Sequence, residues 1–142
     1  MKDDDFEFIN GLFCKLVDKQ EDQGAEVLTK EENVVLLIWH ASGIIGNGGF
    51  RYFFEQELNG EAAAAAYTII GCDKAAELLR LGLSLFPNTV PPASWEERVK
   101  YMDENAELFD RLSEAFWEAD QGMQERLAEY TRSHFDKKSG NR

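Results

Sequence analysis

The sequence predicts an all-α fold, a single-domain bundle of about six to eight helices around a buried central helix. Apolar residues recur at the i, i+3, i+4 spacing of amphipathic helices in most segments, and no segment alternates with the period of a strand. The stretch 34–41 is apolar nearly all round, so a helix there is expected to be buried on every side. We expect the domain to span residues 1–135 and residues 136–142 to form a frayed basic tail.

An apolar set at helical spacing predicts the first helix: Phe6, Ile9, Phe13, Leu16 and Val17. Three aspartates at residues 3–5 favour its N-terminus through the helix dipole. Polar residues 20–24 predict a break. Thr29 and Glu32 then form a capping-box pattern that opens the central helix, which we expect to end near Ser42.

A glycine-rich and aromatic stretch, residues 43–54, follows the central helix. Glycine reaches positive φ at little steric cost, so the stretch predicts a turn where one buried helix ends and another begins. An anion nest of backbone amides is the alternative, but the lysine and Ser/Thr of a phosphate loop are missing. We therefore interpret Asn47, Gly48, Gly49 and Phe50 as a structural signature of the fold.

Further helices are expected over residues 61–70, 73–86 and 95–120, and after Gly122. For residues 95–120 the sequence leaves open whether there is one helix or two. Gly71 separates the segments 61–70 and 73–86, because glycine favours a helix C-terminus. Pro87 ends the second of them, because proline cannot continue a helix. Ser94 opens the 95–120 segment in a second capping-box pattern.

The net charge is −12, from 27 acids and 15 bases, which argues against direct contact with nucleic acid because phosphates require a basic surface. Acids gather in residues 1–32 (10 acids, 4 bases) and 95–120 (9 acids, 3 bases). No apolar run approaches the about 20 residues of a membrane span, and the acidic start does not resemble a secretory signal. We expect a cytoplasmic protein with no membrane partner, and Cys14 and Cys72 reduced and buried.

The 95–120 segment carries a row of carboxylates at helical spacing: Asp103, Glu107, Asp110, Glu114 and Glu118. On one unbroken helix this row would be about 22 Å long. It is either a partner-binding surface or the ordinary solvated face of an amphipathic helix. The near absence of bases favours a binding surface, since exposed helix faces usually mix charges for i, i+4 pairing.

Four residues are candidates for acid–base chemistry: His40, Glu32, Glu55 and His134. None has a partner at a spacing that catalysis demands, and we interpret His40 as structural. The sequence contains no nucleophile elbow, metal-ligand cluster or phosphate loop. It therefore predicts no catalytic residue, no metal and no cofactor.

The order of motifs resembles a family of small bacterial all-helical domains of unknown function, named after a DNA-mimic protein. The matching residues are Glu32, Asn47-Gly48-Gly49-Phe50, Phe53-Phe54, Ile70-Gly71, Leu85-Phe86, and, near the end, Leu112, Phe116, Leu127, Tyr130 and His134. The resemblance implies an α-helical fold. In the protein that gave the family its name it also implies a dimer whose carboxylates imitate DNA phosphates and occupy a DNA-binding regulator. These motifs mark the fold and not a mimicry surface, so the mimic function cannot be carried over to this chain from them.

Two non-enzymatic hypotheses follow. The first is an acidic binding module that competes with nucleic acid for a basic protein, such as a DNA-binding regulator, and so acts as a DNA mimic. The second is an immunity-type or antitoxin-like inhibitor of one basic toxic enzyme, which the composition fits equally well. An enzyme of unknown reaction is the least favoured alternative, and the sequence leaves open whether the chain forms a homodimer.

Overall fold

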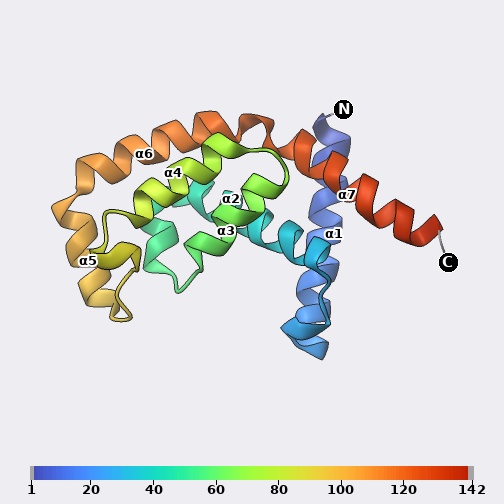
Figure 1. The fold of residues 1–142 in the computed structure, drawn as a ribbon, viewed down its shortest axis with the longest axis horizontal. Coiled ribbons are helices and arrows are strands. Elements are labelled where there is room, and N and C mark those ends of the chain that lie inside the picture. The colour runs from blue at the N-terminus through green and yellow to red at the C-terminus, as the bar shows by residue number, and fades with distance from the viewer. Residues whose placement is uncertain (1, 141–142) are drawn as a thin grey trace.

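A computed structural model describes residues 2–140 of the chain and contains, within that range, seven α-helices, three short 3₁₀ helices and no strand (Figure 1). The helices are α1 (Lys2–Gln23), α2 (Lys30–Glu55), α3 (Gly60–Ile69), α4 (Asp73–Leu83), α5 (Trp95–Glu104), α6 (Ala106–Ala119) and α7 (Met123–Gly140), with η1 (Ala25–Val27), η2 (Pro87–Thr89) and η3 (Asp120–Gly122). The predicted all-α fold is confirmed.

Helix α2 is the central element of the bundle. It packs against α1, α3, α5, α6 and α7, and Figure 1 shows it crossing behind α3 and α4. Its inward side chains Val35, Ile38, Ala41 and Ile45 are completely buried. The Thr29 hydroxyl accepts from the Glu32 amide at 3.0 Å and the Glu32 carboxylate accepts from the Thr29 amide at 2.9 Å, so the predicted capping box opens α2.

The expected end of this helix near Ser42 is wrong. The helix continues through the glycine stretch, and the backbone leaves the helical region at Gly49, where φ is 74° and ψ is −172°. A Cβ at Gly48 would lie 2.5 Å from Tyr52 Cβ, and one at Gly49 would lie 2.8 Å from Ser113 Oγ. Close packing against these neighbours, together with the positive φ of Gly49, explains why residues 48 and 49 are both glycine. The expected turn is therefore a kink inside α2.

Aromatic rings that follow the kink form the centre of the core. The Phe54 ring lies 5.9 Å from Phe50 on α2, 5.3 Å from Phe86 at the end of the α4 segment, and 6.0 Å from Phe109 on α6, measured between ring centroids. All these side chains are at most 3% exposed. Burying each ring stabilises the fold by about 1.5–3 kcal/mol, and the cluster ties α6 to α2.

Helix α1 packs on α2 and α7 at one end of the molecule (Figure 1). Asp5 is buried and accepts from Arg132 Nη1 at 2.9 Å, so one of the first aspartates pairs with α7 in addition to any effect on the helix dipole. Cys72 is buried, but Cys14 is exposed, contrary to expectation. Helix α7 continues to Gly140, so the expected frayed tail is helical up to that residue, and residues 141–142 lie outside the described range.

Candidate interaction surface

Residues 95–120 form two helices, which answers the question that the sequence left open. Helix α5 ends at Glu104, and Asn105 has non-helical φ −119° and ψ 28° before α6 begins. The Asn105 side chain donates to the Tyr101 carbonyl at 2.9 Å and so satisfies an oxygen at the end of α5. The five predicted carboxylates therefore do not lie on one continuous helix.

Asp103 lies on α5 and forms an ion pair with Arg51 of α2. This pair joins two helices and offsets the charge of Asp103. The break at Asn105 and the pairing with Arg51 separate Asp103 from the rest of the predicted row.

The remaining four acids lie on α6 and are all exposed; we call them the α6 acidic face: Glu107, Asp110, Glu114 and Glu118. Eleven residues separate the first from the last, a distance of about 16 Å along the helix. Over the part of the chain that the structure describes, none of these four carboxylates lies within ion-pair distance of a cation. Their negative charge faces solvent, unpaired with any cation among the described residues.

One base interrupts this surface. Arg111 is exposed and follows Glu107 by four residues, so helical spacing places it on the same face, and the net charge there is −3 from four acids and one base. The acids are about 5.5 Å apart along the axis, against about 3.4 Å per phosphate along one DNA strand. The α6 acidic face is thus a sparser line of charge than a single DNA strand.

A second base of the segment is directed inward. Arg98 is only 5% exposed, and its guanidinium donates to the carbonyls of Pro92 at 2.8 Å, Ala93 at 2.9 Å and Glu55 at 3.2 Å. It therefore anchors the connector after η2 to the end of α2. Its positive charge is not presented on the outer surface with the acids.

The glycine kink holds α6 in place from the opposite side. The Phe50 amide donates to Ser113 Oγ at 2.8 Å, Ser113 Oγ donates to the Phe109 carbonyl at 2.8 Å, and Trp117 Nε1 donates to the Ile45 carbonyl at 2.8 Å. Sequence reasoning missed Ser113 and Trp117. Ser113 was detectable as a polar residue flanked by the apolar stripe of α6.

Within the signature, Gly49 and Phe50 are buried, whereas Asn47 and Gly48 are exposed. The buried pair makes the contact with α6, since Phe50 supplies the amide and Gly49 allows the close approach to Ser113. Of the exposed pair, Gly48 lies against Tyr52, whose side chain is 42% exposed.

A carboxylate at the α6–α7 junction has a different environment. Asp120 Oδ2 accepts from Ser42 Oγ at 2.5 Å, and Oδ1 accepts from the Tyr67 hydroxyl at 3.0 Å. Burial raises the pKa of Asp120 from the ordinary 3.8 to about 6, and these two hydrogen bonds only partly counter it. Burial and the nearby Asp120 charge raise the pKa of Tyr67 well above its usual value. No sequence pattern singles out Asp120, because its partners are far away in the chain.

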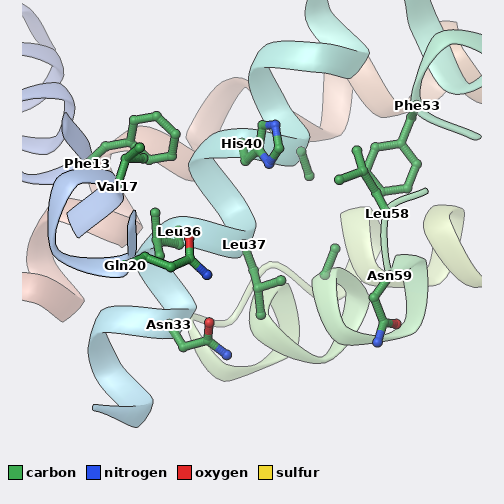
Figure 2. Close-up of a pocket in the computed structure, with 12 residues that line it drawn as sticks. Phe13, Val17, Gln20, Asn33, Leu36, Leu37, His40, Phe53, Leu58 and Asn59 are labelled. Carbon is green, nitrogen blue, oxygen red and sulfur yellow. The ribbon is translucent and has the colours of Figure 1, made fainter. Parts of the chain in front are cut away.

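A cavity of about 480 Å³ lies between α1, α2 and α3, with Phe13 and Val17 on one side and Leu58 and Asn59 on the other (Figure 2). His40 lies at its exposed rim, with its ring 6.4 Å from that of Phe13. The lining is mostly apolar and, among the described residues, includes no fixed charge. The cavity offers hydrophobic contact and no array of acid–base groups.

The four acid–base candidates are not assembled into a site. Glu32 caps α2 and accepts from Lys19 Nζ at 3.0 Å, while His134 Nδ1 lies 2.9 Å from the Tyr130 carbonyl of its own helix. Among the residues that the structure describes, no hydrogen bond joins two of the candidates, and no three His, Cys, Asp or Glu side chains are grouped as metal ligands. None of the described helices is both long and apolar enough to cross a membrane.

Comparison with known proteins identifies one family. The family model described as DMP19-like protein matches residues 26–134, which include α2 with its kink, the α6 acidic face and Asp120. The curated proteins and the solved structures contain no significant match to the chain. The matched segment covers well over half of the sequence and contains the elements that the motifs predicted. The chain therefore belongs to the DMP19-like protein family.

Proposed function

We propose that the protein is a non-enzymatic acidic binding module that uses the α6 acidic face to occupy a basic protein, and that it acts as a DNA mimic. The observation that carries the proposal is the set of four exposed carboxylates on one helix that form no ion pair with any residue the structure describes. Membership of the DMP19-like family supports it. The family name does not specify this chain's partner, so the partner is inferred from charge alone.

The rigidity of α6 adds to this argument. Ser113 and Trp117 hold the inner side of the helix against α2, so the carboxylates are presented from a fixed backbone. A fixed array loses less conformational entropy on binding than the same charges on a mobile segment. The net charge of −12 raises the rate of encounter with a basic partner, and this attraction weakens as salt screens it.

The test is capture from a bacterial lysate on immobilised protein at increasing salt concentration. The test variant neutralises the face with Glu107→Gln, Asp110→Asn, Glu114→Gln and Glu118→Gln. A matched control neutralises four exposed acids near the end of α1 with Asp18→Asn, Glu21→Gln, Asp22→Asn and Glu26→Gln. Wild type and control are expected to retain a DNA-binding protein at low salt, and the α6 variant to lose it.

Competition with duplex DNA separates the two partner classes. Release of the captured protein by DNA supports a mimic, whereas a captured toxic enzyme that DNA does not displace supports the inhibitor alternative. Failure to retain any basic protein at low salt, or equal retention by the α6 variant, would refute the proposed function.

A further inference from the structure

The Asp120 carboxylate is largely buried and, among the described residues, is hydrogen-bonded only to neutral groups. Its two donors, the hydroxyls of Ser42 and Tyr67, are neutral, and among the described residues no cation lies within ion-pair distance. A largely buried carboxylate normally has a counter-charge, because transfer from water penalises the charged form. A carboxylate has about four lone-pair sites. Two hydroxyl donors therefore occupy about half of them.

This carboxylate lines a cavity of about 490 Å³ formed by the first half of α1, the middle of α2 and the junction from η3 into α7. Cavities of about 300–1,000 Å³ accommodate small molecules or large side chains. Among the described residues that line it, Asp120 alone is charged. The cavity therefore combines one unneutralised negative charge with room for a ligand.

Aromatic rings form the wall on the α1–α2 side. The Phe6 and Trp39 rings lie 5.4 Å apart at an interplanar angle of 58°, and Trp39 Nε1 donates to Asn10 Oδ1 at 3.0 Å, which orients the indole. The faces of indole and phenyl rings attract cations, and a carboxylate forms its strongest hydrogen bonds with ammonium or guanidinium groups. Phe6 is 49% exposed, so the wall is accessible from solvent.

We propose that this cavity binds an organic cation, a guanidinium or alkylammonium group, with Asp120 as the counter-charge and Phe6 and Trp39 as the aromatic wall. The cation is either a free amine or guanidine, or the arginine or lysine side chain of another protein. The site lies on residues other than the α6 acidic face, so it does not depend on the proposed function.

The test uses the indole Nε1–H resonance of Trp39 in ¹⁵N-labelled protein, titrated at pH 7.5 with methylguanidinium, methylammonium and N-acetyl-arginine amide. Trp95 and Trp117 are internal controls, because they do not line the cavity. We expect saturable shifts of the Trp39 signal with a Kd of roughly millimolar magnitude, typical of a single small group. Stronger binding of the simple cations indicates a free amine or guanidine, and stronger binding of the arginine derivative indicates a side chain.

Asp120→Asn is expected to weaken binding about tenfold or more, because a charge-assisted contact is lost. Phe6→Leu, at a half-exposed position where folding is least at risk, is expected to weaken it by a smaller factor. Glu129→Gln, which removes an exposed carboxylate of α7 that does not line the cavity, serves as the matched control and should leave binding unchanged. A Trp39 signal that does not respond in the wild type, or responds equally in Asp120→Asn, overturns the proposal.

Discussion

The Phe50 amide donates a hydrogen bond to Ser113 Oγ across 2.8 Å, joining the kink of α2 to the inner side of α6. Both residues are buried, and the same hydroxyl donates to the Phe109 carbonyl. The helix that carries the acidic face is thus positioned by a main-chain group at the glycine kink.

Ser113→Ala should destabilise the protein by about 1–3 kcal/mol, because the Phe50 amide would be left buried without a partner. Urea unfolding measures the change. Ser133→Ala, at an exposed position of α7, is the control and should change the free energy of unfolding by no more than about 0.5 kcal/mol. Equal stability of the two variants would show that another group satisfies the amide.

Gly49→Ala and Gly46→Ala should have opposite effects on the thermal midpoint. At Gly49 an alanine meets a φ of 74° and Ser113 Oγ at 2.8 Å, so we expect a loss of about 1–3 kcal/mol. Gly46 is helical and exposed with nothing within 4 Å of an added Cβ, so alanine there should stabilise by about 0.5–1 kcal/mol. A loss at both positions would contradict the assignment of the kink to Gly49 alone.

Asp120 should make the protein less stable as pH rises from about 4 to about 6. Burial raises the pKa of Asp120 from 3.8 to about 6 in the folded state, so the folded state binds the proton more tightly than the unfolded state does. This contribution to stability is lost as the pH rises through about 6. A difference of about 2 in pKa corresponds to at most about 3 kcal/mol. The groups around Asp120 are Ser42 from α2, Tyr67 from α3 and Cys72. Burial raises the pKa of Cys72, and the charge of Arg126 on α7 partly counters that increase.

Asp120→Asn isolates this contribution, because the amide keeps the shape of the side chain and does not ionise. Its stability relative to wild type, from urea unfolding, should be higher at pH 7.5 than at pH 4 by up to about 3 kcal/mol. A difference that does not change with pH would mean that Asp120 titrates normally.

Arg98→Met should destabilise the protein by about 2–4 kcal/mol. The substitution retains apolar volume but leaves the carbonyls of Pro92, Ala93 and Glu55 without their shared donor. Lys100→Met, at an exposed position of the same helix, should have little effect on chemical unfolding. Similar costs for both would indicate that the carbonyls find water instead.

Local patterns predicted most helices, because capping residues and apolar spacing act within a few positions of each other. The end of α2 could not be predicted in this way. Gly43, Gly46 and Gly48 disfavour a helix individually, but packing of Phe50, Phe53 and Phe54 in the core outweighs that propensity. The end of α2 was misplaced because the backbone preference of these glycines is offset by tertiary contacts that the local sequence does not show.

For the candidate surface, the sequence predicted which α6 acids lie together but not which of the five acids is set apart from them. Helical spacing identified the four acids of α6, whereas the separation of Asp103 depends on Arg51, a residue distant in the chain. The surroundings of Asp120 are likewise non-local, since Ser42 and Tyr67 come from two other helices. Interactions between side chains far apart in sequence leave no periodic pattern to detect.

The position of Trp117 gives the protein an intrinsic fluorescence reporter. Its indole N–H is tied to the Ile45 carbonyl, its ring is 44% exposed, and it directly precedes Glu118. A molecule that covers this side of α6 would exclude solvent from the ring and shift its emission to shorter wavelength, while the tether keeps the ring from moving away. Engagement of the helix can thus be followed optically without an attached label once the emission of Trp39 and Trp95 is removed by substitution with phenylalanine.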